Sequence, residues 1–266
     1  MEKSKLSSLL KRVLSTLVMA PIVIGAIIAG WNTTVILLLL VCSILAWEWS
    51  TMVSNKNQTI FAVTYLMTAA ATFSFSDIFY PLILMIVSSL FVWWKAKGET
   101  YRKLLVFGVP YIALGIGAMA WFYTLFGPLA TLWLLLAVWS VDIGGYVVGC
   151  TVKGPKLAPK ISPNKTWSGL LGAMIFAIAV SFAFAYYNIP GYENTYIYYV
   201  IFGAALAVVA QAGDLLESKI KRVLNVKDSS NLIPGHGGMF DRIDGLLVTA
   251  PVLLIVLYVM YINAVW

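Results

Sequence analysis

The feature that most constrains this chain is a series of nine apolar stretches separated by short polar segments. About 20 consecutive apolar residues cross the hydrocarbon core of a bilayer as an α-helix. The stretches have this length, not the alternating pattern of about ten residues that marks an outer-membrane β-barrel. The sequence therefore predicts an all-α, polytopic membrane protein with about nine transmembrane helices. The stretches are 13–31, 33–49, 60–76, 78–94, 104–126, 128–150, 168–187, 195–213 and 245–265.

The composition excludes most other classes of protein. Apolar residues make up 61% of the 266 residues and charged residues only 11%. Soluble domains contain about 45–50% apolar and about 25% charged residues, so a water-soluble globule of this size would lack the polar residues to cover its surface. Disordered and collagen-like chains are excluded on the same numbers. Cys42 and Cys150 both lie in apolar stretches, and no disulfide framework is expected.

The basic residues indicate an orientation in the membrane. All 18 Lys and Arg residues fall into five groups, and nine spans place these groups on one side of the bilayer. The positive-inside rule then predicts a cytoplasmic N-terminus and a C-terminus outside. The net charge of +7 is therefore concentrated on one side of the membrane, and topology with attraction to anionic lipid explains the first three groups. The groups lie within 3–12, at Lys56, and within 95–103, 153–165 and 219–242.

We expect residues 1–266 to form a single integral membrane domain. Residues 1–126 would be N-terminal spans, and residues 127–266 would carry the chemistry, with cytoplasmic loops at 151–167 and 214–244. Gly127-Pro128 is a turn signal between the fifth and sixth spans. The basic N-terminus and first apolar run resemble a signal peptide, but the run exceeds a typical h-region and predicts an uncleaved span.

Asp142 places one carboxylate inside an apolar stretch. It stands about 12 Å from the cytoplasmic end of its span at the helical rise. A carboxylate at that depth seldom faces lipid, so we expect it to face a polar cavity or a cation. Gly144, Gly145 and Gly149 allow close helix packing or a local break. The alternative is a packing motif with a protonated aspartate.

The loop that follows has the composition of a phosphate-binding segment. Prolines at 155, 159 and 163 prevent a helix from forming. The loop ends at a predicted helix N-terminus, where backbone N–H groups favour anions. Basic cytoplasmic loops with prolines are common, so this signal is weak by itself. The side-chain donors are Ser162, Asn164, Thr166 and Ser168, and the lysines are Lys160 and Lys165.

A second region, residues 213–245, is more specific. It holds five of the eleven acids, five of the eighteen basic residues and the only histidine. On a helix, four of its polar residues share one face because they are three, four and seven positions apart. These residues are Asp214, Glu217, Ser218 and Lys221.

The end of this region adds two more acids and a flexible backbone. Asp241 and Asp244 stand three residues apart and open the last predicted span. The preceding Pro-Gly-His-Gly-Gly segment (234–238) can approach a phosphate closely. The acids of the whole region therefore lie on the cytoplasmic side. The alternative is a solvated juxtamembrane hairpin of mixed charge.

Carboxylates beside basic residues indicate a hard cation and a polyphosphate. Mg²⁺ prefers a few carboxylate oxygens together with water and substrate phosphates. Two metal ions would bridge an in-line displacement at phosphorus, and Lys and Arg would stabilise the developing charge. No zinc site is expected, because the cysteines are remote and there is no second histidine. Two further acids, Glu48 and Asp228, are predicted to be surface or interfacial residues.

These residues resemble the signature of the phosphatidate cytidylyltransferases, also called CDP-diacylglycerol synthases. Asp142 with its glycines and the loop 162–169 also look like features of that family. The resemblance covers residues 139–248, whereas the first 100 residues resemble the family only as apolar spans. The matched positions are Ser218, Lys221, Arg222, Lys227, Asp228, Pro234, His236, Gly237, Gly238, Asp241, Arg242 and Asp244.

The resemblance implies that CTP and phosphatidate react to give CDP-diacylglycerol and pyrophosphate. It implies a Mg²⁺-dependent enzyme of phospholipid biosynthesis in the inner (cytoplasmic) membrane of the cell, with its active site facing the cytoplasm. The lipid phosphate would attack the α-phosphorus of CTP. This phosphate is already an anion, so positioning and charge neutralisation suffice. The resemblance leaves open whether a second cation, divalent or monovalent, is bound and whether the protein forms a homodimer. No nucleic acid is expected as a partner.

The resemblance also implies roles for individual residues. The metal ligands would be Asp214 and Asp241, with Asp244 and Asp142 in direct or supporting contact. The catalytic set would be Asp214, Asp241, Lys221 and Arg242. The substrate-binding set would be Ser162, Asn164, Lys165, Ser218, Arg222, Lys227, His236, Gly237 and Gly238.

Three alternative functions fit the sequence less well. A transporter or channel would use acids near the bilayer midplane and often paired repeats; Asp142 fits, but the other acids do not. An enzyme that transfers the phosphatidyl group of CDP-diacylglycerol to an alcohol needs Asp-Gly followed closely by Ala-Arg, whereas Asp244-Gly245 precedes Leu-Leu-Val-Thr. A structural membrane subunit would need no cluster of acids and glycines.

Overall fold

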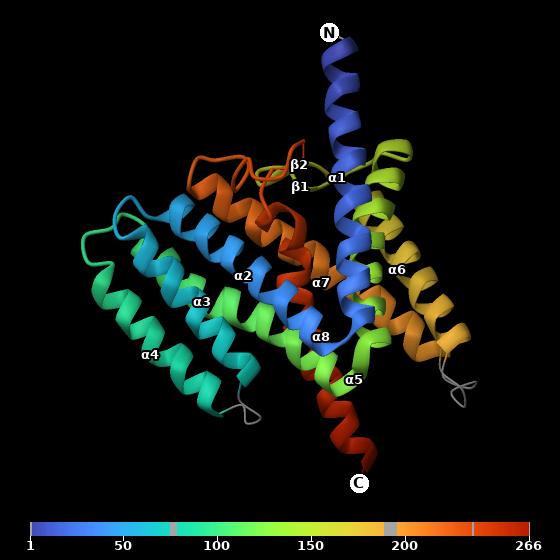
Figure 1. The fold of residues 1–266 in the computed structure, drawn as a ribbon. Coiled ribbons are helices and arrows are strands. Elements are labelled where there is room, and N and C mark those ends of the chain that lie inside the picture. Colours follow the sequence, from blue (N-terminus) through green and yellow to red (C-terminus); the bar gives the residue numbers. More distant parts are fainter. Residues whose placement is uncertain (1, 75–78, 189–195, 236, 266) are drawn as a thin grey trace. The chain divides into compact units, whose positions relative to one another are not determined.

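The computed structural model describes residues 2–74, 79–188, 196–235 and 237–265 (Figure 1). Within these residues it contains eight helices and one two-stranded hairpin, so the all-α class is confirmed with the hairpin as an addition. The helices are α1 (Glu2–Ala29), α2 (Trp31–Val53), α3 (Gln58–Ser74), α4 (Phe79–Lys95), α5 (Arg102–Thr151), α6 (Trp167–Asn188), α7 (Tyr196–Val223) and α8 (Phe240–Val265). The strands are β1 (Lys156–Ala158) and β2 (Ser162–Thr166).

The helices follow the apolar stretches. Helix α5 covers two of them, and it is interrupted at Gly127, whose φ of 81° and ψ of 179° are not helical. The predicted break at Gly127-Pro128 is therefore confirmed. In the described part of the chain, five helices are long and apolar enough to cross a membrane, within α2, α5, α6, α7 and α8. Several apolar helices of this kind indicate an integral multi-pass membrane protein; nine spans and their orientation stay predictions.

The chain divides into two compact units. Unit 1 comprises residues 1–125 and 224–243, and unit 2 comprises residues 126–223 and 244–266. One boundary falls beside the break at Gly127. The other two boundaries enclose the segment 224–243, so the signature-like residues are shared between the units: Lys227 to Arg242 lie in unit 1, and Ser218 to Arg222 with Asp244 lie in unit 2.

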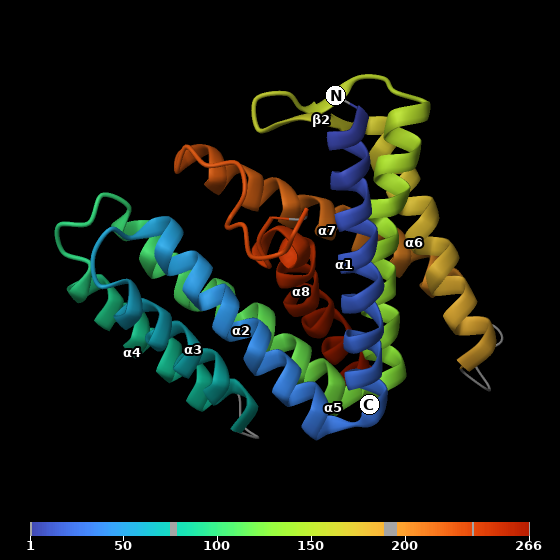
Figure 2. The same ribbon diagram turned by 45° about the horizontal axis from the view of Figure 1, so that its top comes forward.

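Unit 1 is built on antiparallel helices with aromatic residues between them. Helices α2, α3 and α4 lie side by side (Figure 2). The first half of α5 packs on α2 and α3, since the Trp49 Nε1 donates to the Leu104 carbonyl at 3.3 Å and the Tyr65 hydroxyl donates to the Leu105 carbonyl at 2.8 Å. Gly108 makes room for Trp49, because a Cβ there would lie 2.2 Å from the indole nitrogen.

Unit 2 depends on glycines that let helices approach closely. The Trp133 Nε1 of α5 donates to the Ser181 hydroxyl of α6 at 3.0 Å. A Cβ on Gly144 of α5 would lie only 2.6 Å from the carbonyl oxygen of Gly172 in α6. The sequence left open whether Gly144 allows close packing or a local break, and the structure shows close packing.

Replacing Gly144 by Ala is expected to destabilise unit 2 by about 1–3 kcal/mol, because the new methyl group would overpack against backbone that cannot move easily. Thermal unfolding in detergent would show a lower Tm. Gly25→Ala in α1 is the matched control, since nothing lies within 4 Å of a Cβ at that position. Equal Tm values for the two variants would contradict the close-packing account.

Candidate active site

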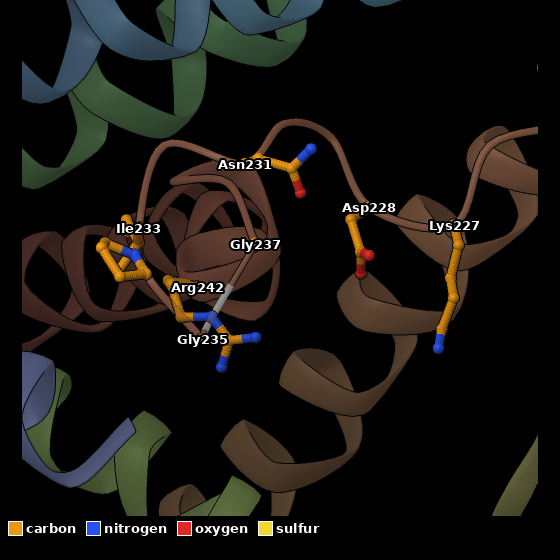
Figure 3. Close-up of a pocket in the computed structure, with 8 residues that line it drawn as sticks. Lys227, Asp228, Asn231, Ile233, Gly235, Gly237 and Arg242 are labelled. Atoms are coloured by element: carbon orange, nitrogen blue, oxygen red, sulfur yellow. The ribbon is translucent and has the colours of Figure 1, made fainter. Parts of the chain in front are cut away.

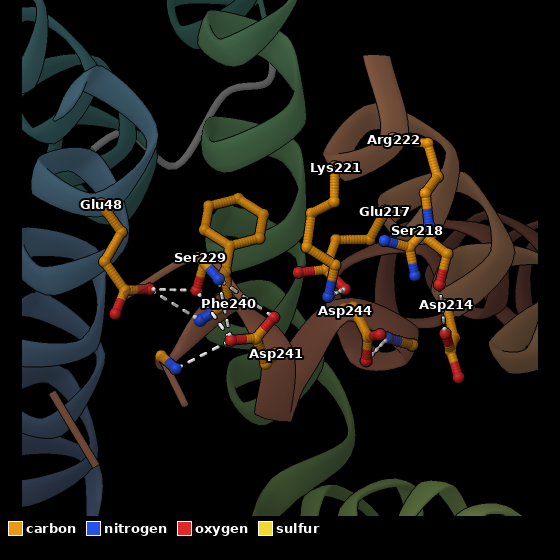
Figure 4. Close-up of polar contacts among 12 residues, drawn as sticks. Glu48, Asp214, Glu217, Ser218, Lys221, Arg222, Ser229, Phe240, Asp241 and Asp244 are labelled. Atoms are coloured by element: carbon orange, nitrogen blue, oxygen red, sulfur yellow. Dashed lines mark hydrogen bonds and ion pairs between the residues drawn. The ribbon is translucent and has the colours of Figure 1, made fainter. Parts of the chain in front are cut away.

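The polar face of α7 forms as the sequence predicts. The helix continues to Val223, well past the predicted span end at residue 213, and its apolar side is buried at Ile220. On the polar side, the Ser218 hydroxyl donates to Asp214 Oδ1 at 3.2 Å, and the Lys221 ammonium forms an ion pair with Glu217 Oε2 at 2.9 Å (Figure 4). Both pairs have the four-residue spacing that puts side chains on one helix face.

Asp214 is joined by a lysine from the hairpin. The ammonium group of Lys165 in β2 forms an ion pair with Asp214 Oδ2, and both side chains are half-buried. The Arg222 Nε also reaches the Ile161 carbonyl of the hairpin turn, at 3.5 Å. Two residues from separate predicted loops, Lys165 and Asp214, are therefore in direct contact within unit 2.

Asp244, at the start of α8, completes a cluster of four acids in unit 2. Glu217, Asp214 and Asp142 are all close enough to interact with it electrostatically. The Glu217 side chain is only 1% exposed. The sequence predicted Asp142, Asp214, Asp241 and Asp244 as metal ligands, and all of these except Asp241 lie in this cluster. It also placed Glu217 on the same helix face as Asp214 without assigning it a role.

Close approach of α7 and α8 brings these acids together. A Cβ on Gly213 of α7 would lie 2.9 Å from the Asp244 carbonyl oxygen and 3.1 Å from Gly245 Cα of α8. Glycine at 213 is therefore required by packing next to Asp214. The sequence did not predict this packing role for Gly213 or Gly245.

The acid cluster has the donor chemistry that suits Mg²⁺. Carboxylate oxygens are hard ligands of the kind this ion prefers. Four carboxylates face two lysines, Lys165 and Lys221, so negative charge is in excess and a cation would relieve the repulsion. Within the described ranges, no three His, Cys, Asp or Glu side chains converge as a preformed metal site. The predicted ligand Asp241 belongs to unit 1.

In unit 1, Asp241 is held by the loop that precedes α8. Its Oδ2 accepts hydrogen bonds from the Gly238 N–H at 2.8 Å, the Ser229 N–H at 3.0 Å and the Ser229 hydroxyl at 3.1 Å (Figure 4). A Cβ on Gly237, whose φ is 84°, would lie 2.7 Å from the same oxygen. The two glycines therefore allow the loop to fold tightly around Asp241.

The same segment encloses a pocket of about 540 Å³ (Figure 3). It brings together three residues predicted to bind phosphate, Lys227, Gly237 and Arg242. Figure 3 shows the charged ends of Lys227, Asp228 and Arg242 extending to the same side of the loop. His236, also predicted to bind substrate, lies outside the described residues. The lining residues are Lys227, Asp228, Asn231, Ile233, Pro234, Gly235, Gly237 and Arg242.

The prediction that Glu48 is a surface or interfacial acid is wrong. Its side chain is 0% exposed, and it accepts hydrogen bonds from the N–H groups of Met239 at 2.9 Å and Phe240 at 2.8 Å. A signal was present in the sequence: Glu48 lies inside an apolar stretch, as Asp142 does, and an acid in that setting needs a polar partner. Asp228 is exposed, as predicted.

Several residues of the hairpin have a structural role. The predicted absence of helix in this loop is confirmed, because the segment pairs as antiparallel strands. Thr166 caps α6, since its hydroxyl accepts a hydrogen bond from the Gly169 N–H at 3.1 Å. The Ser168 hydroxyl contacts Thr166 at 3.0 Å and donates to the Lys153 carbonyl. Asn164 is exposed and Ser162 is half-buried.

The fold and these residues define a multi-pass membrane protein with a cluster of acids and a basic pocket. The chain belongs to the cytidylyltransferase family, whose model matches residues 10–260. This membership confirms the resemblance found in the sequence.

Several relatives that are similar to this chain carry the name phosphatidate cytidylyltransferase. The chain is 39% identical over 184 residues to the phosphatidate cytidylyltransferase of Rickettsia bellii (strain RML369-C), covering 66% of this chain and 78% of that protein. It is 37% identical over 187 residues to the protein of the same name from Rickettsia felis, covering 67% and 81%. Over 129 residues it is 43% identical to the Brucella suis phosphatidate cytidylyltransferase, covering 48% and 46%.

Proposed function

We propose that this chain transfers CMP from CTP to phosphatidate and so produces CDP-diacylglycerol and pyrophosphate for phospholipid biosynthesis. The observation that carries the proposal is the family match over residues 10–260, with relatives named phosphatidate cytidylyltransferase at 39% and 37% identity. The acid cluster of unit 2 and the basic pocket of unit 1 provide the groups that a nucleotide triphosphate and its cation need.

The reaction is an in-line displacement at phosphorus. An oxygen of the phosphatidate phosphate forms a bond to the α-phosphorus of CTP, and the bond between that phosphorus and the pyrophosphate oxygen breaks. No general base is needed, because the attacking phosphate is an anion. Lys227 and Arg242 would bind the triphosphate in the pocket and stabilise the charge that builds up on the leaving pyrophosphate.

Asp214 and Asp241 are the proposed Mg²⁺ ligands, supported by Asp244 and Asp142. When bound, the ion would neutralise the triphosphate and stabilise charge at the reacting phosphorus. Lys165 and Lys221 pair with Asp214 and Glu217 and so reduce repulsion among the acids. The remaining proposed substrate contacts are Ser162, Asn164, Lys165, Ser218, Arg222, His236, Gly237 and Gly238, and Lys221 is a further proposed catalytic residue. The identity of a second cation is left open.

We also propose the orientation predicted by the basic residues. Nine spans would place every Lys and Arg group on the cytoplasmic side. CTP would then reach the site from the cytoplasm, and phosphatidate would reach it from the bilayer of the inner membrane. A helix face exposed in the structure can contact lipid or a second copy of the chain.

The proposed function is tested with the purified full chain in detergent, using labelled CTP, phosphatidate and Mg²⁺. We expect a labelled lipid and pyrophosphate in equal amounts, loss of both with EDTA, and recovery when Mg²⁺ is restored. Absence of a labelled lipid under these conditions would contradict the proposal. Uptake of a solute into liposomes without lipid turnover would favour the transporter instead.

A further inference from the structure

A buried carboxylate of α2 supports the loop that carries Asp241, entirely within unit 1. Glu48 is 0% exposed, and a buried charge is costly unless hydrogen bonds satisfy it. Among the described residues, its four hydrogen-bond donors all come from residues 229–240: the N–H groups of Met239 and Phe240, and the hydroxyls of Ser229 and Ser230. Glu48 therefore tightly binds a segment 191 residues away along the chain.

Glu48 caps the N-terminus of α8 from another helix. The first N–H groups of a helix have no partner within it, and a side chain just before the helix usually accepts them. Here the N–H groups of Met239 and Phe240 donate to Glu48 at 2.9 and 2.8 Å. A carboxylate is favoured at this end of a helix by the macrodipole. Because Glu48 accepts these N–H groups, the side chain of Asp241, the second residue of α8, accepts hydrogen bonds from the loop instead.

Ser229 connects Glu48 to Asp241. Its hydroxyl oxygen lies 3.2 Å from Glu48 Oε2 and 3.1 Å from Asp241 Oδ2, and its N–H donates to the same Asp241 oxygen at 3.0 Å (Figure 4). The hydroxyl carries one hydrogen, which the two carboxylates must share. A shift of Glu48 therefore moves Ser229, and with it two of the donors that orient Asp241.

The packing around these residues fixes the arrangement. The rings of Trp49, Tyr111 and Phe240 contact one another, with centroid distances of 5.3 Å from Trp49 to Phe240, 5.7 Å from Tyr111 to Phe240 and 5.6 Å from Trp49 to Tyr111. Trp49 and Phe240 are both fully buried. Two neighbouring residues of α2, Glu48 and Trp49, thus bind the backbone and the ring at the start of α8.

We propose that Glu48 is a positioning residue for the cytidylyl transfer. It does not contact substrate; it holds the loop 229–241 so that Asp241 is oriented for the cation and the triphosphate. This inference rests on the proposed function, because Asp241 has its role only in that reaction.

The test compares Glu48→Gln with the unaltered protein in the CTP and phosphatidate assay. Glutamine keeps the size and one acceptor oxygen, but its NH₂ group would face a backbone N–H where the second oxygen had accepted one. We expect kcat to fall by about 10- to 100-fold, in the range seen for losing a supporting contact behind a metal ligand. The Mg²⁺ concentration for half-maximal rate should rise several-fold.

Glu99→Gln is the matched control. Glu99 also supports a loop, because it accepts hydrogen bonds from the Ser54 hydroxyl at 2.8 Å and the Lys56 N–H at 3.2 Å. Among the described residues its hydrogen bonds go to residues 54–56 and not to residues 229–241. We expect its kcat and its Mg²⁺ dependence to match those of the unaltered protein.

The outcomes separate this inference from the proposed function. If the unaltered protein makes no CDP-diacylglycerol, the proposed function fails. If that protein is active and Glu48→Gln keeps its kcat and Mg²⁺ dependence, the inference is overturned. It is also overturned if kcat falls while the Mg²⁺ dependence is unchanged, because Glu48 would then have only a structural role.

A second variant covers the case in which Glu48→Gln does not fold. Ser229→Ala removes only the hydroxyl between the two carboxylates. We expect a smaller fall in kcat and a raised Mg²⁺ requirement. An unchanged Mg²⁺ requirement in Ser229→Ala would overturn the inference.

Discussion

Replacing Asp241 by Asn is expected to lower kcat by about 10²- to 10³-fold, as for the loss of a major electrostatic contact in an active site, and to leave the protein folded. The asparagine oxygen can still accept hydrogen bonds from the N–H groups of Gly238 and Ser229, so the loop keeps its main support. The negative charge proposed to bind Mg²⁺ is lost. The rate of labelled lipid formation and the Tm in detergent measure the two effects separately.

Glu99→Gln again serves as the control, since it removes a carboxylate charge from a different loop. It should retain the full rate. A near-normal rate for Asp241→Asn with Mg²⁺ present would show that Asp241 is not a metal ligand. A large fall in Tm would show that its charge is needed for folding.

Gly238→Ala is expected to lower activity by about 10²-fold or more, since small displacements of positioned groups cost roughly this much. A Cβ at this position would lie 2.0 Å from the Ser229 hydroxyl oxygen and 2.6 Å from Glu48 Oε1. Its φ is outside the left-handed region, so the loss would come from the collision alone. The same lipid-forming assay measures it.

Two comparisons make this prediction specific. Gly25→Ala, at a position with nothing within 4 Å, should keep its activity. Adding Ser229→Ala to Gly238→Ala removes the nearest atom and should restore part of the lost activity. Full activity in Gly238→Ala itself would mean that the loop does not need this tight packing.

The features that the sequence predicted correctly depend on local rules. Apolar runs gave the helices, and a glycine before a proline marked the break at Gly127. The face of α7 that carries Asp214 and Ser218 follows from helical spacing. Gly237 and Gly238 were predicted to approach a phosphate, and their close packing around Asp241 was not predicted.

The features that it did not predict depend on distant contacts. Glu48 meets Phe240 across 192 residues, and no local pattern pairs them. Thr166 was grouped with phosphate donors by composition, but its hydroxyl caps α6. Gly213 is needed because the Asp244 carbonyl lies close to it, which only the packing of α7 on α8 reveals.

The position of the bound divalent cation tests whether Asp214 and Asp241 are the metal ligands. Mn²⁺ in place of Mg²⁺, with CTP present, can be located by anomalous scattering in crystals of the full chain. We expect Mn²⁺ at a coordination distance of about 2.1 Å from carboxylate oxygens of both Asp214 and Asp241. A cation bound to neither residue, or the two carboxylates on opposite membrane faces, would contradict it.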